Sequence, residues 1–465
     1  MKKLLLFILA IVSVTISSFA QEGASVFKNY KYRFQKYRIL TTSFNMGNDN
    51  RVTDNIPQSS SSNNSSSAFD LRGAIQFSQS INTQKLQQFT SFGGAVSYER
   101  DKSYSSATNY SNSNGSSIAI SVDQQNRFYK NNHFFELNYY IGNREFYNKS
   151  RFNGFPKHSN QIDMNGSIKI GAGNGRLEMV GDVAQALFIL KDFKNRGIIT
   201  NYTSDDATAL AKAITRIYNT RIIDFRYRLR GQLGMLDSFF VSSGLIDGNK
   251  QQSNYFISLF DNWLNNNYVQ RFCGSRFSYG ISYGNQYSND FKYQAISSNY
   301  LSHRYINSSY TPGVYFNYTH EKPISLYWQE SFSVDLMGMR NYAYEYYNRI
   351  DTSTITIYSS KNLITTSMLN VHYKISWYPN SRTYFNAGIA GSVWYSVASP
   401  PQWQWNPIRI SLTPYANMFY FVSPKVNFNI GISPRVQFTH FFVHRTSNIN
   451  AQIPALNAGL NYYIY

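Results

Sequence analysis

The sequence predicts an all-β chain whose antiparallel strands form a closed barrel across a membrane. Three observations favour this fold over a soluble sandwich: side chains alternate between apolar and polar, short connections alternate with long ones, and aromatic residues gather at both ends of the strands. Aromatic residues make up 17% of the 465 residues, whereas hydrophobic residues reach only 42%. Strand-forming rings are therefore abundant, while long apolar runs are scarce.

The N-terminal residues 1–20 predict a secretory signal. Lys2 and Lys3 precede an apolar centre from Leu4 to Val14, and small residues follow as far as Ala20. An uncleaved anchor is the alternative, but the apolar centre is shorter than the ~20 residues that a membrane-spanning helix needs. We therefore expect the chain to leave the cytoplasm.

The charge of the chain predicts anionic partners. The net charge is +19, and removal of the two signal lysines leaves +17. At a cell surface such a balance suits lipopolysaccharide phosphates, although a solvated basic surface is the alternative. The lone Cys273 has no partner for an internal disulfide, so packing and hydrogen bonds must hold this exported chain together.

Short and long connections alternate along the chain, as expected for a barrel with tight turns on one side of the membrane. The short ones lie near residues 82–85, 131–132, 321–323, 379–382 and 423–425. The long ones lie near residues 49–67, 104–116, 149–160, 288–303, 347–361, 400–407 and 447–454. About fourteen strands follow, with twelve or sixteen left open by boundary errors. They are expected at 36–48, 68–81, 86–102, 117–130, 133–147, 161–174, 269–287, 304–319, 325–345, 362–378, 383–398, 408–422, 426–445 and 455–465.

The stretch "MLNVHYKISWYP" at residues 368–379 illustrates the two faces of a strand. Its odd-numbered residues are apolar and its even-numbered residues are mostly polar, so they point to opposite sides of the sheet. In a membrane barrel the apolar row faces lipid and the polar row faces the lumen. The predicted lumen-facing residues are Asn370, His372, Lys374, Arg409, Asn417, Arg435 and Gln437.

Aromatic residues decide which face meets lipid. Trp and Tyr collect where hydrocarbon meets headgroups, because each ring has an apolar body and a polar edge. Rings lie next to both the short turns and the long loops, which predicts two belts at the membrane interfaces. The predicted interface residues include Trp328, Trp377, Trp394 and Tyr420.

With these features the chain resembles the outer-membrane β-barrel proteins of Gram-negative bacteria. The stretch "SSFAQ" is similar to export signals common among Bacteroidota. The C-terminal "ALNAGLNYYIY" is similar to the aromatic-ending strand that the barrel assembly machinery recognises in this class, although the apolar row is out of phase with Tyr465. The resemblance is at the level of the class, and it implies a location in the outer membrane.

Residues 176–265 break the alternation and predict a helical insert between barrel strands 1–6 (21–175) and strands 7–14 (266–465). A first helix is expected to end at Gly197, and a second to begin after Thr203 or Ser204, which are good N-cap residues. A third is expected from Leu229, Leu233, Leu236 and Phe240, and "YFISLFDNWL" predicts a fourth. The insert occupies the place of a short turn, so it is expected on the periplasmic side, unless a miscounted strand moves it outside. It forms either a packed subdomain or a plug that enters the barrel.

Motifs for catalysis are weak. "GAGNGR" at Gly171–Arg176 fits neither a dinucleotide-binding nor a Walker spacing, so it is interpreted as a hinge between strand and helix. His440 and His444 would lie about 13 Å apart on a strand, too far for one metal ion. We therefore expect no enzyme activity, no cofactor and no metal site, and the export signal argues against nucleic-acid binding.

Two functions remain as hypotheses. The first is an outer-membrane channel or transporter for a small solute, in contact with outer-membrane lipid and lipopolysaccharide. The second is an anchor or assembly component without transport, in which the barrel presents the helical insert to a periplasmic or surface protein partner.

Overall fold

The computed structural model describes residues 24–31, 33, 37–55, 62–106, 109–152, 155–218, 225–247, 253–265, 271–296, 299–351, 354–399, 407–423, 426–441 and 446–462. The predicted signal, 1–20, lies outside them. The strands are β1 (Tyr37–Asn55), β2 (Ser62–Asn82), β3 (Leu86–Ser106), β4 (Asn109–Lys130), β5 (His133–Phe152), β6 (Phe155–Met179), β7 (Phe272–Ile296), β8 (Asn299–Pro323), β9 (Trp328–Asp351), β10 (Ile355–Asn380), β11 (Thr383–Ser399), β12 (Pro407–Ser423), β13 (Val426–Phe441) and β14 (Thr446–Tyr462). The helices are α2 (Ala24–Asn29), α3 (Gly181–Asn195), α4 (Ser204–Tyr218), α5 (Phe225–Ser242) and α6 (Ser253–Asn265).

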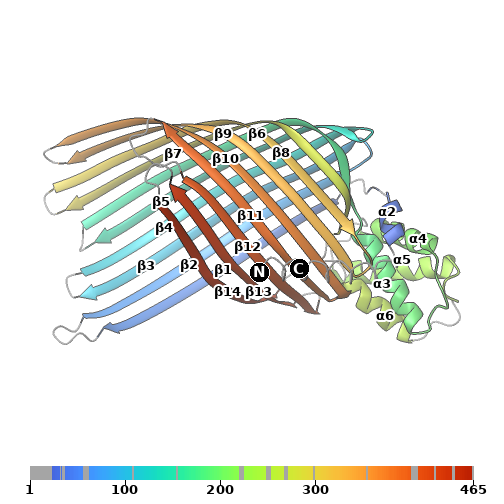
Figure 1. Cartoon of the computed structure of the whole chain (residues 1–465). Helices are drawn as coiled ribbons and strands as arrows, with labels where there is room; N and C mark the ends of the chain where they lie inside the picture. Colours follow the sequence, from blue (N-terminus) through green and yellow to red (C-terminus); the bar gives the residue numbers. More distant parts are fainter. Residues whose placement is uncertain are drawn as a thin grey trace.

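The strands form one antiparallel sheet in which each strand pairs with its neighbours in sequence, from β1 to β14. Figure 1 shows the sheet strongly curved, with its strands tilted and the helices gathered at one end. The predicted all-β antiparallel architecture is confirmed. Within the described residues β1 and β14 are the two edges of the sheet, so its closure into a barrel stays a prediction.

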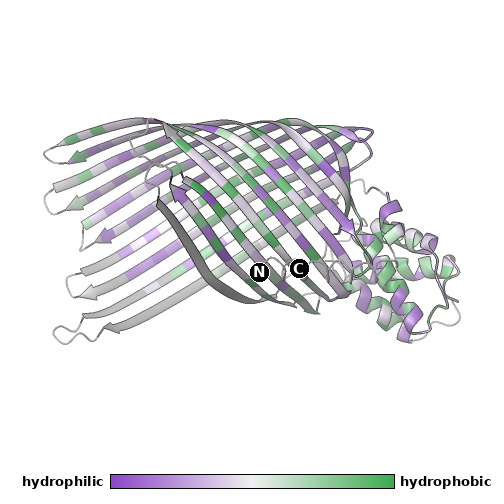
Figure 2. Cartoon of the chain, in the orientation of Figure 1, coloured by the Kyte–Doolittle hydropathy of each residue, from purple (hydrophilic) through white to green (hydrophobic). Residues whose placement is uncertain are grey.

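One face of the sheet is apolar and exposed. Ile170, Ile281 and Val314 lie side by side on β6, β7 and β8, and their exposed fractions are 37%, 61% and 60%. Figure 2 shows hydrophobic and hydrophilic residues alternating along the strands, as this arrangement requires. A soluble sheet would bury such a row, so this face needs an apolar surrounding.

The polar face is the concave one. The side chain of Tyr315 on β8 reaches Glu136 on β5, and that of Arg176 on β6 reaches the turn between β2 and β3. Such contacts skip intervening strands, and side chains converge in this way only on the inner side of a curved sheet. We call the polar side of the sheet the concave face. The polar row of the stretch at residues 368–379 therefore looks into the curve and its apolar row looks out, as predicted.

The long connections are much shorter than predicted, and strands replace them. The predicted loop at 49–67 contains the paired residues Arg51 and Ser66, and the predicted loop at 104–116 contains the pair Tyr104 and Tyr110. A membrane strand needs about 9–11 residues, whereas β10 has 26. The hairpins therefore extend well past an apolar band. Ser-rich and Asn-rich stretches lack an alternating apolar row, so periodicity does not detect such strands.

The α3–α6 helices pack into a small subdomain at the short-turn end of the sheet. Figure 1 places them beyond the strand ends, so they form a packed unit and not a plug between the strands. α2 packs against this subdomain through Val26 and Phe27, and the turn between β8 and β9 contributes Leu326 to the same core. The helices thus lie at the end of the sheet that carries the short turns. Which side of the membrane this end faces stays a prediction.

Local signals account for the helix ends. Gly197 follows α3 with a φ of +69°, and its amide donates to the carbonyl of Lys194 at 3.1 Å. The Thr203 hydroxyl accepts from the amide of Asp206 at 3.2 Å, while the Asp206 carboxylate accepts from the amide of Thr203 at 2.8 Å. This reciprocal cap fixes the start of α4. None of the described helices is long and apolar enough to cross a membrane.

Candidate functional site

A polar network occupies the concave face at the helix end of the sheet, and we call it the arginine network. It joins β4, β5, β6, β7 and β8 to the chain segment that precedes β1. Its members are Arg33, Arg127, Tyr129, Glu136, Arg176, Glu178, Arg276 and Tyr315.

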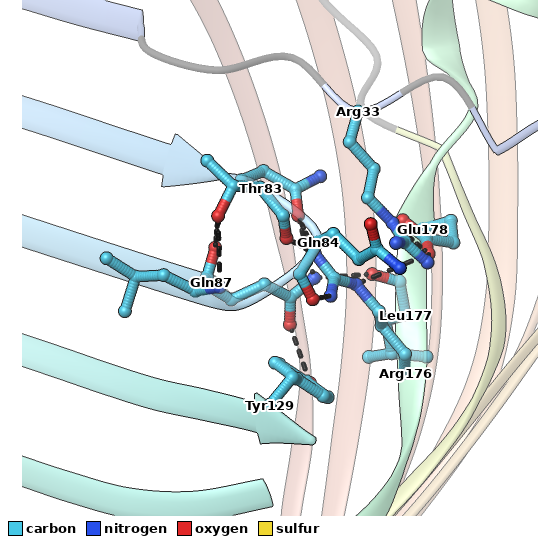
Figure 3. A network of polar contacts seen from close by, with 10 residues as sticks. Arg33, Thr83, Gln84, Gln87, Tyr129, Arg176, Leu177 and Glu178 are labelled. Carbon is cyan, nitrogen blue, oxygen red and sulfur yellow. Dashed lines mark hydrogen bonds and ion pairs between the residues drawn. The ribbon is translucent and has the colours of Figure 1, made fainter. Parts of the chain in front are cut away.

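Arg176 connects the end of β6 to the turn between β2 and β3. Its guanidinium donates to the carbonyl oxygens of Gln84 and Thr83 at 3.1 and 2.6 Å, and it also contacts the side chain of Asn82. Figure 3 shows this side chain extending to the turn, above Tyr129. The guanidinium lies 4.4 Å from the centre of the Tyr129 ring, a distance at which a cation is attracted to the ring face.

Glu178 holds the segment before β1 in place. Arg33 donates to its carboxylate through Nε and Nη2 at 2.9 and 2.7 Å, and Arg176 Nε lies 3.3 Å from the same oxygen. Figure 3 shows Glu178 between these two arginines. Because two guanidinium groups share one carboxylate, this half of the network carries a net positive charge.

Glu136 is the centre of the other half, and only 2% of its surface is exposed. Its carboxylate accepts from Arg127 Nε at 2.7 Å and from the Tyr315 hydroxyl at 3.1 Å. The row that joins Glu136 to Tyr315 across the sheet passes through Gly171 and Gly280. The tyrosine crosses two strands because neither glycine has a side chain in its way.

This arrangement corrects the interpretation of "GAGNGR" as a hinge. Gly171–Arg176 lie inside β6. Gly171–Asn174 pair with both β5 and β7, and Gly175 and Arg176 pair with β7. A Cβ atom at Gly171 would overlap the Tyr315 hydroxyl, and one at Gly173 would overlap the ring of Phe134. These glycines therefore leave room for side chains from neighbouring strands to lie across the concave face of β6. The strand continues to Met179 before the helices begin.

The seven predicted lumen residues lie on the concave face, on β10, β12 and β13. Asn370 and Gln437 belong to one row across the sheet, which also contains the hydrogen-bonded Ser392 and Ser411. His372 hydrogen-bonds Tyr415 at 2.6 Å. Asn417 donates to Asn386 at 2.9 Å. The remaining three are Lys374, Arg409 and Arg435.

Three of the four predicted interface aromatics lie on the apolar face near the short turns. Trp328 and Trp377 stack with ring centres 5.9 Å apart, and Tyr420 shares their face. Trp394 does not belong with them. It pairs with Arg409 on the concave face, where the guanidinium lies 4.8 Å from its ring. Its prediction as a lipid-facing residue is wrong, because Val393 and Tyr395 occupy the outward positions of that strand segment.

Sequence reasoning missed most of the arginine network. Glu136 alternates with outward apolar residues of β5, so its inward direction was predictable. The contact between Glu136 and Tyr315 was not predictable, because it depends on the register of four strands. The alternate spacing of Gly171, Gly173 and Gly175 on one face is the signal that points to it.

Arg271, directly before β7, fastens the helical subdomain to the sheet. Only 1% of its surface is exposed. It donates to the carbonyls of Leu326 and Ser325 at 2.7 and 2.9 Å and to Gln329 Oε1 at 2.9 Å. Its guanidinium also lies 4.7 Å from the ring of Phe27 and 4.8 Å from that of Tyr378. Burial lowers its pKa to about 10, so it remains a cation at neutral pH.

Asp182 gives the subdomain a predicted pH dependence. Its carboxylate accepts from the Tyr30 hydroxyl at 3.1 Å and contacts Thr215, and burial raises its pKa above the usual value in spite of these donors. The folded state therefore holds the proton more tightly than the unfolded state, so stability is gained as pH falls through the raised pKa and lost above it. We expect the melting temperature of the helices, followed by circular dichroism at 222 nm, to fall as the pH rises above the usual aspartate value of 3.8. Asp182→Asn should lose most of this pH dependence, and an unchanged dependence would contradict the assignment.

Metal ligands do not cluster in the part of the chain that the structure describes: no group of three His, Cys, Asp or Glu side chains is placed to hold an ion. His440 belongs to β13, whereas His444 lies outside the described residues. The two carboxylates of the arginine network, from Glu136 and Glu178, are already paired with arginines. The site can bind a polar or charged molecule.

No protein-family model matches the chain, and a search of curated proteins gives no match. Among solved structures, the chain is similar to the β domain of the Bordetella autotransporter BrkA, with 9% identity and a TM-score of 0.27 over 81% of this chain and 98% of that one. It is also similar to the ferric yersiniabactin uptake receptor FyuA from Yersinia pestis, with 7% identity and a TM-score of 0.37 over 92% and 70%. The P. putida toluene transporter TodX gives 7% identity and a TM-score of 0.29 over 96% and 93%. These are outer-membrane β-barrel proteins. With TM-scores below 0.5, the similarities assign neither a family nor an activity.

Proposed function

We propose that this chain is an outer-membrane β-barrel that carries a small polar solute across the membrane. The observation that supports this most directly is the division of the sheet into two faces. Residues such as Ile281 and Val314 expose apolar side chains on the convex face, whereas the concave face carries hydrogen-bonded polar side chains. An apolar exterior suits lipid, and a polar interior suits water and a hydrated solute.

The proposal places the helical subdomain in the periplasm. Short turns occupy the periplasmic side of such barrels, and α3–α6 lie at the short-turn end. The long polar hairpins then extend from the outer surface, where basic residues can contact lipopolysaccharide phosphates. Transport of this kind requires no cofactor and no catalytic step.

Conductance in planar lipid bilayers tests the transport function. The full chain is compared with a variant in which residues 181–265 are replaced by a Gly-Ser linker. We expect a stepwise current from at least the variant, and a smaller one from the full chain if the subdomain narrows the opening. If neither protein conducts although both are folded and inserted, the transport function is contradicted.

A second function has a specific observation in its favour. Phe256, Ile257 and Phe260 of α6 are exposed at 46%, 62% and 45%, while the opposite side of the same helix is buried in the subdomain core. Large exposed apolar groups in one place are typical of interaction surfaces. The subdomain would then present α6 to a periplasmic protein. Loss of binding to the periplasmic protein in Ile257→Glu, with unchanged conductance, would favour this alternative.

A further inference from the structure

The charges of the arginine network do not balance. It contains four guanidinium groups, from Arg33, Arg127, Arg176 and Arg276, but only two carboxylates, from Glu136 and Glu178. The ammonium group of Lys169 adds a further positive charge on the same face, because it lies 5.7 Å from the ring of Tyr315. Cations that are drawn together without enough carboxylates repel one another, so this arrangement favours an anion.

Each carboxylate is already occupied. Glu136 accepts from Arg127 and Tyr315, and Glu178 is shared between Arg33 and Arg176. Arg276 interacts with Tyr129 and with the charges of Arg127 and Glu136. Among the described residues, no carboxylate is within ion-pair distance of Arg276. Its charge is therefore the one that an added anion would satisfy best.

The site around Arg276 is preorganised. Arg176 covers one face of the Tyr129 ring at 4.4 Å, and the Tyr129 hydroxyl donates to Gln87 at 2.9 Å. Arg127 is fixed by Glu136. The donors thus hold their positions before any ligand arrives, which lowers the entropy cost of binding. A planar guanidinium matches the oxygen spacing of phosphate and carboxylate groups.

We propose that the arginine network binds an oxyanion group, with Arg276, Arg127 and Arg176 as the principal donors. This inference deepens the proposed transport function, because it identifies the solute as one that bears a phosphate or carboxylate group. The site lies at the helix end of the concave face, where a solute passes between the lumen and the periplasm.

Calorimetric titration of the purified full-length protein in detergent with pyrophosphate, at constant ionic strength, tests the proposal. We expect saturable binding by the wild type and a loss of about tenfold or more in affinity in Arg276→Gln. Arg276→Lys keeps the charge but not the planar fork, so its affinity should lie between the two. Arg409→Gln is the matched control, because Arg409 is also on the concave face but stacks on Trp394 outside the network.

Absence of binding in the wild type, or equal weakening in Arg276→Gln and Arg409→Gln, would overturn the anion site. A wild-type affinity in a folded Arg276→Gln variant would do so too. The readout does not depend on conduction, so the two proposals fail separately. Binding without current overturns transport alone, whereas current without binding overturns only the oxyanion site.

Discussion

Replacing Arg271 with methionine is expected to destabilise the docked helical subdomain by about 4 kcal/mol, because the buried carbonyls of Ser325 and Leu326 lose their donors and each unpaired group costs ~1–3 kcal/mol. The substitution also removes the cation between the rings of Phe27 and Tyr378. Methionine fills much of the volume of the arginine side chain, so the loss of stability reflects the missing polar contacts more than a cavity. Urea unfolding followed at 222 nm measures the effect, since each helical residue contributes more to that signal than a strand residue does.

Two variants sharpen this test. Arg271→Lys retains the charge, but one ammonium cannot reach all the acceptors of a guanidinium, so we expect about half the loss. Arg382→Ala is the control, because Arg382 pairs with Asp261 of α6 at the same junction while both side chains are more than a third exposed. Such a pair is worth about 0–1 kcal/mol. If Arg271→Met cost no more than Arg382→Ala, Arg271 would not be the residue that fastens the subdomain.

Much of the architecture could be predicted because it follows from local patterns of residue type along the sequence. Alternation along 368–379 gave the two faces of β10, and the polar capping residues around Thr203 and Gly197 gave the helix ends. These signals depend only on residues close in sequence. The hairpin extensions were missed for the opposite reason: segments such as 62–67 are polar on both faces, so no local pattern separates an extended strand from a loop.

The positions of several other side chains depended on information that a single strand does not contain. Arg271 occurs in a stretch without a recognisable motif, and its burial follows from four elements that meet around it. Trp394 was assigned to lipid because tryptophan prefers interfaces, but its parity on β11 directs it to the concave face. Residue type suggested that Trp394 faces lipid, but the register of β11 places it on the concave face.

Gly171→Ala is expected to destabilise the sheet by about 3 kcal/mol, the upper end for overpacking, because the added Cβ would overlap both the Tyr315 hydroxyl and the backbone oxygen of Tyr279. Gly284→Ala is the matched control. It places a methyl group on the same face of the neighbouring strand, where the nearest atom is 3.8 Å away, so we expect a change within ~1 kcal/mol. Both are measured by urea unfolding in phospholipid vesicles.

A double-mutant cycle with Tyr315→Phe separates the two overlaps. Phenylalanine lacks the hydroxyl, so it removes the hydrogen bond to Glu136 and also relieves one of the two overlaps that alanine at position 171 creates. The double variant should therefore lose about 1 kcal/mol less than the sum of the single variants. Strict additivity would mean that Tyr315 does not lie across Gly171. Coupling of the expected sign would show that the glycines of β6 serve to bring Tyr315 to Glu136, and hence to build the arginine network.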